Sequence, residues 1–105
     1  MVYLIVVGKS SLAKDAPDIV GQIEFSELAV LSKLIKRRDM AFLHDVACFF
    51  EDRSFSLPVL QETQADLFAM LPENLAADER AMLHKLLAVV GYACHRQLPM
   101  FGVAS

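Results

Sequence analysis

His44 and Cys48 are the two residues of this chain whose types and spacing come closest to those of a chemical site. Positions four apart on a helix lie on the same side, so this pair suits two metal ligands or a thiolate beside an imidazole. A closed zinc site needs four ligands, however, and the sequence contains no C-x-x-C and no second H-x-x-x-C. We therefore favour a core thiol beside a peripheral histidine, with no metal and no cofactor. The alternative is a small enzyme or metal-binding protein that adds a histidine from residues 76–98.

A second chemical pattern, Gly8-Lys9-Ser10, follows an apolar run and is similar to the end of a phosphate-binding loop. The complete loop, G-x-x-x-x-G-K-[ST], follows a strand and opens a helix. Here Tyr3 stands where the first glycine is required, and the residues between are strand formers that cannot turn their amides toward a phosphate. Pro17 follows before any amphipathic helix. We therefore predict a strand that ends in a glycine turn, and no nucleotide site.

No catalytic constellation stands out elsewhere in the sequence. The glycines are scattered at positions 8, 21, 91 and 102, so they form no glycine-rich loop, and no nucleophile elbow is present. We expect a protein that is not an enzyme, and we assign no catalytic, cofactor-binding or metal-binding residues.

The longest predicted helix, residues 76–98, divides into three stripes at 100° per residue. Apolar side chains cover nearly half of its circumference, and Asp78, Lys85, Tyr92 and Arg96 occupy only a narrow polar sector. A helix with so little polar surface is central to its domain or lies between two subunits. The third stripe consists of small residues and histidines, which would let another backbone approach closely. We predict that this stripe binds a partner through Ala81, His84, Ala88, Gly91 and His95.

The two histidines of this stripe, His84 and His95, are about three helical turns, or roughly 16 Å, apart along the axis. They cannot act together on one substrate atom. Because imidazole titrates near neutral pH, they are compatible with a pH-sensitive interface.

The strand pattern predicts an α+β fold in which a small antiparallel sheet packs against about four helices. Val2–Val7 is apolar on both faces, which indicates a central strand. In the second strand of a long-looped hairpin, Ile19, Ile23 and Phe25 share one face under alternation. The strands are expected at residues 2–7 and 19–25, with 100–104 as a possible C-terminal addition.

Four helices are expected from the spacing of apolar residues and from their end signals. Ser26 is predicted to cap the first helix, which Lys36-Arg37-Arg38 closes where cations suit the helix dipole. Ser56 is predicted to cap the third, with Pro58 in its first turn. The first helix is expected over residues 26–38 including its Ser26 cap, the second over 40–52, the third from the segment 54–58 to residue 71, and the fourth over 76–98.

Composition points toward association. The 105 residues suffice for a single domain, residues 1–105, with one core. They are 55% hydrophobic, with a mean hydropathy of +0.41 and a net charge of −3. So apolar a small chain is expected to bury surface against itself, as a homodimer, or against another protein. Nucleic acid is not an expected partner, because the helix dipole explains the local basic patch of Lys33, Lys36, Arg37 and Arg38.

The sequence also predicts a location. No apolar run approaches the 18 residues of a membrane span, and no basic segment precedes the N-terminal apolar run as in a signal peptide. We therefore expect a cytoplasmic protein with no membrane partner. In that compartment Cys48 and Cys94 are expected to be reduced rather than joined in a disulfide.

These observations favour a non-catalytic interaction domain that forms a homodimer or binds another protein. Its binding surface would be the small-residue stripe of residues 76–98. One concrete version is an immunity or inhibitor protein of a bacterial toxin, an analogy of size and acidic charge alone.

Overall fold

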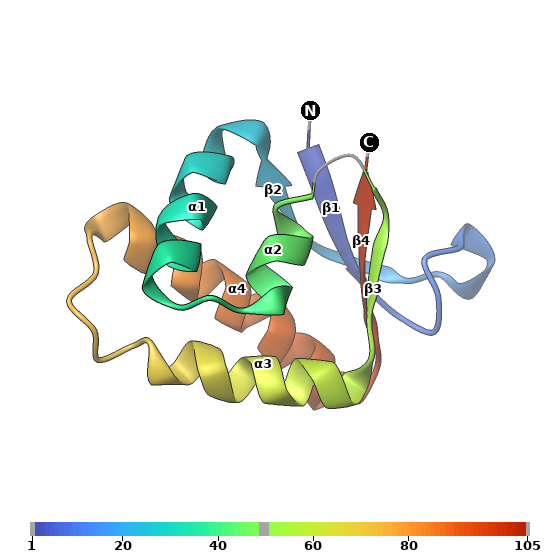
Figure 1. Ribbon diagram of the computed structural model, residues 1–105. Helices are drawn as coiled ribbons and strands as arrows, with labels where there is room; N and C mark the ends of the chain where they lie inside the picture. The colour runs from blue at the N-terminus through green and yellow to red at the C-terminus, as the bar shows by residue number, and fades with distance from the viewer. Residues whose placement is uncertain (1, 49–50, 105) are drawn as a thin grey trace.

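In the computed structural model, which describes residues 2–48 and 51–104, helices cover one face of an antiparallel sheet (Figure 1). Four strands in these ranges lie in the order β2-β1-β4-β3, which confirms the predicted α+β class. The radius of gyration, 12.9 Å, is that of one compact unit of this length. The elements are β1 (Val2–Val7), η1 (Ala13–Asp15), β2 (Asp18–Glu24), η2 (Phe25–Glu27), α1 (Leu28–Arg37), α2 (Ala41–Val46), β3 (Arg53–Phe55), α3 (Leu57–Ala69), α4 (Ala77–Arg96) and β4 (Met100–Ala104).

Strand β1 lies inside the sheet, as its apolar sequence predicts, with antiparallel neighbours β2 and β4 on its two sides. Its residues Tyr3, Ile5 and Val7 are buried against the helices. Leu4 and Val6 alternate with them and point to the opposite face, which the helices leave uncovered (Figure 1). The pairing with β4 confirms the expected C-terminal strand.

The second strand is confirmed, but the facing of its residues differs from the prediction. The β1–β2 pairing steps from Gly21 to Ile19 and skips Val20, which makes a β-bulge. Because the extra residue reverses the alternation, Ile23 is fully buried whereas Ile19 is 68% exposed on the opposite face. Phe25 belongs to the short helix η2 rather than to the strand, and its ring is exposed.

The predicted second helix, residues 40–52, is too long, because α2 ends at Val46. Residues 49 and 50 lie outside the described residues, and the chain then enters the edge strand β3, which the sequence pattern does not predict. Phe55 of β3 packs against Phe42 of α2, with ring centroids 5.1 Å apart. Pairing with β4 and packing against a distant ring thus decide the conformation of this segment.

Helix α1 confirms the first predicted helix, but its start differs. Ser26 lies within η2 and is not the N-cap. Instead, Glu24 and Glu27 form a reciprocal capping box, in which the Glu24 amide donates to Oε1 of Glu27 at 2.9 Å. This capping box lies at the start of η2, which runs directly into α1, so the helical segment begins before Ser26.

Helices α3 and α4 confirm the last two predicted helices, with Ser56 at the N-cap position of α3 and Pro58 in its first turn. Helix α4 packs closely on the sheet, since a Cβ added to Gly21 would lie 3.1 Å from Cγ1 of Val89. No helix in the described part of the chain combines the length and apolar character needed to cross a membrane.

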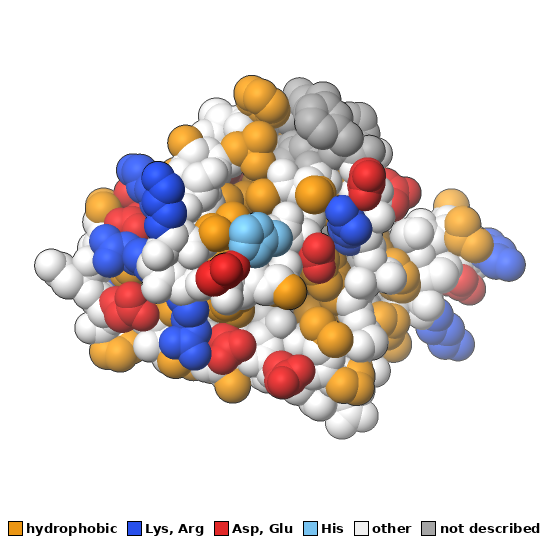
Figure 2. Space-filling view, in the orientation of Figure 1, with side chains coloured by type: hydrophobic (Ala, Val, Ile, Leu, Met, Phe, Trp, Pro, Cys, Tyr) orange, Lys and Arg blue, Asp and Glu red, His pale blue; other side chains and the backbone are white. Residues whose placement is uncertain are grey.

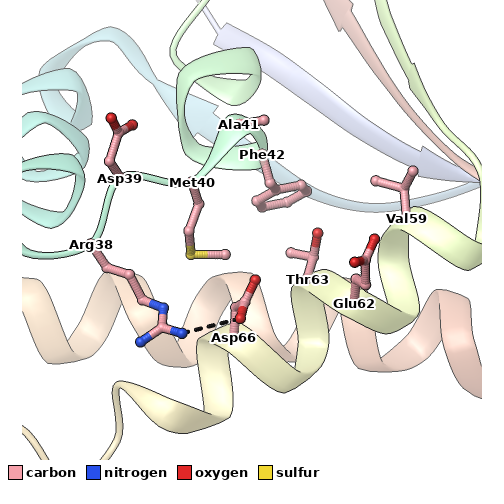
Figure 3. A pocket seen from close by; sticks show the side chains of 9 residues that line it. All are labelled: Arg38, Asp39, Met40, Ala41, Phe42, Val59, Glu62, Thr63 and Asp66. Carbon is pink, nitrogen blue, oxygen red and sulfur yellow. Dashed lines mark hydrogen bonds and ion pairs between the residues drawn. The ribbon is translucent and has the colours of Figure 1, made fainter.

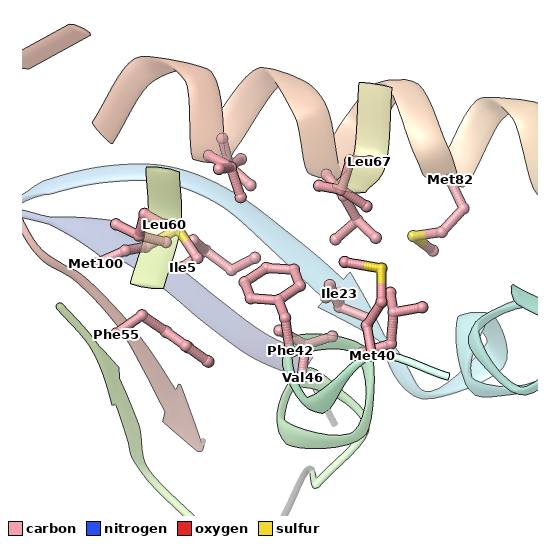
Figure 4. Packing of buried hydrophobic residues seen from close by; sticks show 14 of the residues in the cluster. Ile5, Ile23, Met40, Phe42, Val46, Phe55, Leu60, Leu67, Met82 and Met100 are labelled. Carbon is pink, nitrogen blue, oxygen red and sulfur yellow. The ribbon is translucent and has the colours of Figure 1, made fainter. Parts of the chain in front are cut away.

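The core fills the space between the sheet and the helices. Figure 4 shows Phe42 projecting from α2 into the middle of the buried cluster. The largest fully buried side chains come from every layer of the fold: Tyr3, Ile5, Ile23, Leu31, Leu34, Leu43, Leu60, Leu67, Met70, Leu83 and Leu86.

Candidate functional site

The predicted pair His44 and Cys48 does not share a helix face. Because α2 ends at Val46, Cys48 lies beyond the helix and the spacing argument no longer applies. His44 instead places Nε2 2.5 Å from Oδ1 of Asp39, and both side chains are exposed. Within residues 2–48 and 51–104, no three or more His, Cys, Asp or Glu side chains form a group that could hold a metal. The pair therefore lacks a third ligand in the described part of the chain.

Cys48 instead interacts with Arg53 of β3. The sequence pattern could not reveal this neighbour because it does not predict β3. Hydrogen bonding to Cys48 raises the pKa of the Arg53 guanidinium. The hydroxyl of Tyr3 donates to the carbonyl oxygen of Glu51 at 3.2 Å, and burial raises the pKa of Tyr3 to about 12. Tyr3 therefore remains a proton donor at neutral pH and ties the chain before β3 to β1. Both cysteines are free and partly buried.

The segment Gly8-Lys9-Ser10 opens a projecting loop, residues 8–17, which we call the arm (Figure 1). Strand β1 ends just before it, as predicted, the chain bends at Gly8 and Lys9, and the arm contains the short helix η1. A Cβ on Gly8 would lie 2.9 Å from that of Pro17. Glycine therefore lets the two ends of the arm meet closely.

Two of the three stripes predicted on α4 are engaged within the chain. The apolar stripe is buried in the core. The polar sector makes ion pairs with α1, η2 and β2. These contacts are Lys33 Nζ–Asp78 Oδ2 at 2.9 Å, Lys85 Nζ–Glu27 Oε1 at 2.8 Å and Arg96 Nη1–Asp18 Oδ2 at 3.1 Å, with Tyr92 also bonded to Asp18 at 2.9 Å.

The third stripe of α4 is the side that the chain leaves open. Ala81, His84, Ala88 and His95 are exposed. Gly91 is partly buried, and a Cβ placed there would lie 3.6 Å from Nε2 of Gln64 on α3. The structure thus brings the five residues of the predicted binding stripe together on one accessible side, beside α3.

The basic patch on α1 is joined to α3 and α4 by ion pairs. Arg37 holds Glu79 with two hydrogen bonds, Nε–Oε2 at 2.5 Å and Nη2–Oε1 at 3.0 Å. Arg38 Nη2 lies 3.1 Å from Oδ1 of Asp66. Figure 2 shows the result, since blue and red side chains are interleaved over this end of the molecule. Ion pairs, beyond the helix dipole, account for Lys33, Arg37 and Arg38 of this patch.

Lowering the pH is expected to weaken the contact between α1 and α4 through Glu79. Hydrogen bonding by Arg37 and by the Ala76 amide holds the pKa of this enclosed carboxyl below its ordinary value. Because the folded pKa is the lower one, the stabilisation is complete above the unfolded value of about 4.3 and is lost as the pH falls through the folded pKa. We expect the free energy of unfolding, measured with urea, to fall below about pH 5.

Glu79→Gln removes this titration and tests its origin. The variant should be less stable than the wild type at pH 7 and should lose part of the acid dependence. Glu62→Gln, on the exposed side of α3, is the matched control and should keep the wild-type curve. An unchanged pH dependence in Glu79→Gln would contradict the assignment.

A surface hollow of about 570 Å³ lies between the α1–α2 connection and α3 (Figure 3). Met40 and Phe42 point into it from above, and the ion pair of Arg38 with Asp66 closes one end. Asp39 points away from the hollow. Met40 and Phe42 are only 7% and 3% exposed, so they offer little apolar surface in this hollow.

A second hollow, of about 340 Å³, lies on the sheet face opposite the helices. Leu4, Val6, Ile19 and Val103 form its sheet side. The arm forms the other side through Ser11, Ala13, Ala16 and Pro17. The sequence indicated that β1 needs cover on both faces, but the bulge that turns Ile19 to this side could not be read from it.

These features define a small α+β protein with a four-stranded antiparallel sheet, helices on one sheet face and an arm on the other. Comparisons of the chain with protein-family models, with curated proteins and with solved structures found no match. Its function is therefore inferred from the surfaces and contacts described above.

Proposed function

We propose that this protein is a non-catalytic interaction domain that acts by binding protein surfaces, of another protein or of a second copy. The observation that carries the proposal is the open side of α4. The other two sides of this helix are occupied by the core and by ion pairs, so one continuous stripe of small residues and histidines faces outward. Small side chains leave the helix backbone accessible to a closely packed partner.

An exposed aromatic ring adjoins this stripe. Gln64 of α3 faces Gly91, and Phe68 lies one helical turn further along the same side of α3. The Phe68 side chain is 52% exposed. An accessible aromatic ring beside a flat, small-residue surface is the kind of anchor that contributes most to protein–protein binding.

We expect the partner to be a protein met in the cytoplasm. The small size, the net charge of −3 and the accessible apolar surface fit an inhibitor- or immunity-type protein, which binds another protein and performs no reaction itself. Because Asp78 and Glu79 already pair with cations of α1, and Asp66 with Arg38 just after it, this binding would depend on shape and apolar contact more than on free acidic charge.

Ala88→Glu is the variant that tests the proposed surface. A charged, longer side chain in the middle of the stripe should weaken partner binding at least about tenfold, because it holds the partner away and must be desolvated. Ala29→Glu, at an exposed position of α1, makes the same chemical change elsewhere. The measurement is capture from a lysate of the source organism by each immobilised variant, with mass spectrometry of the retained proteins.

A protein retained by the wild type and by Ala29→Glu, but lost from Ala88→Glu, is the expected result. Its affinity for the purified variants then measures the effect. Equal retention by all three proteins would place the binding surface elsewhere and contradict the role of the α4 stripe.

A further inference from the structure

We propose that the sheet face opposite the helices binds a second copy of this chain, so that two sheets pack face to face in a homodimer. The inference rests on the proposed function, which allows either another protein or a second copy as the partner. The surface used here is distinct from the α4 stripe. The face is defined by Leu4, Val6, Ile19, Phe101 and Val103.

The apolar character of this face follows from strand alternation. Phe101 pairs with Val6, and Val103 pairs with Leu4, so these four side chains form a block on β1 and β4. The bulge in β2 adds Ile19 to the block, with 68% of its surface exposed. A sheet whose two faces are both apolar is typically covered on both sides; on this face Val6 is already only 5% exposed, whereas Ile19 stays open.

The arm adds apolar surface at one end of this face. Leu12, near its tip, is 56% exposed, while the hollow between the arm and the sheet is about 340 Å³ and mainly apolar. One chain therefore carries both an exposed apolar side chain and an apolar hollow. Both features lie at the arm end of the sheet, and a two-fold dimer would contain each of them twice.

The distribution of charged residues at the two ends of the sheet favours a second copy as the partner at this face. At the end where β1 begins, the acidic residues Glu24 and Asp52 are exposed, with Glu24 opposite Val2. Past the other end of β1, the arm carries the exposed cations Lys9 and Lys14.

Asp15 and Asp18 lie at the basic end too, and within the described residues only Asp18 is paired with a cation, Arg96, so the two lysines and Asp15 together leave a net charge of +1. Asp15 accepts a hydrogen bond from Ser10 at 2.5 Å, and Asp18 binds Tyr92 and Arg96. The two-fold axis of the proposed dimer lies between the two sheets and runs perpendicular to the strands. It therefore places the basic end of each copy over the acidic end of the other. A second copy carries the same ends in the reverse order, so both end contacts are between opposite charges.

Sedimentation equilibrium of the purified full chain tests the proposal. We expect a dimer at tens of micromolar whose dissociation constant rises with NaCl concentration. Ile19→Glu should weaken dimerisation by about 100-fold, because a charge would be buried on the apolar face. Since Ile19 is already mostly exposed, this variant should fold, and an unchanged urea midpoint in the monomer range checks that it does. Phe101→Glu is a second variant on the same face.

Two matched controls separate this inference from the proposed function. Val59→Glu alters an apolar side chain of α3 that is 43% exposed, and Ala88→Glu alters the α4 stripe; both should remain dimeric. Lys9→Glu combined with Lys14→Glu should weaken the dimer and reduce its salt dependence. A monomeric wild type, or a dimer that survives Ile19→Glu and Phe101→Glu, overturns the sheet-face dimer. A dimer broken by Ala88→Glu instead would also overturn it while supporting the α4 surface.

Discussion

Gly102→Ala is expected to lower the free energy of unfolding by about 3 kcal/mol or more. Gly102 lies on β4 where the ring of Tyr3 packs directly over the backbone, and an added Cβ would overlap that ring. Tyr3 has no room to move, because it is fully buried and its hydroxyl is bonded to the Glu51 carbonyl. The overlap must therefore separate β1 from β4 or expel the ring.

Gly91→Ala is the matched control, with the opposite sign expected. A Cβ at this position in α4 would make an ordinary contact, 3.6 Å from Nε2 of Gln64. Replacing a helical glycine by alanine reduces the entropy lost on folding, so we expect a gain of about 0.5–1 kcal/mol. Urea unfolding of both variants at pH 7 makes the comparison. Similar stability changes in the two proteins would show that close approach of Tyr3 does not govern position 102.

Phe42→Ala is expected to cost about 3–5 kcal/mol. The ring is 3% exposed, occupies the middle of the cluster in Figure 4 and packs against Phe55 at 5.1 Å between centroids. Its removal leaves a cavity that α2 and the sheet cannot close, since both are held by their other contacts. Because β3 has only three residues and depends on the Phe55 contact, its amides should exchange hydrogen faster in this variant.

Phe68→Ala provides the matched comparison on the surface. This ring is 52% exposed on α3, and alanine favours the helix, so stability should change by less than about 1 kcal/mol. The same variant should weaken partner binding if the α4 stripe and its neighbouring ring form the binding surface. Urea unfolding with hydrogen exchange at residues 53–55 separates the two phenylalanines. An equal loss of stability from both would contradict the core role of Phe42.

The proposed binding stripe was predictable because it depends on the periodicity of one helix. A rotation of 100° per residue places Ala81, His84 and Ala88 on one side whatever surrounds α4. The contacts that fill the polar sector were not predictable, because Lys33, Glu27 and Asp18 reach it from other elements. The His44–Cys48 pair failed for the related reason that α2 ends before Cys48.

The sequence by itself determined the α+β class, the strand at Val2–Val7 and the helical segments, because apolar periodicity and end signals are local properties of the chain. Only the tertiary structure decided that Ile19 faces away from the helices, that residues 53–55 pair with β4, and that Gly102 lies under Tyr3. These features arise from hydrogen bonds and packing between residues far apart in sequence, whose energies exceed local propensity. The accessible surfaces of this protein, and with them its proposed partners, follow from those non-local contacts.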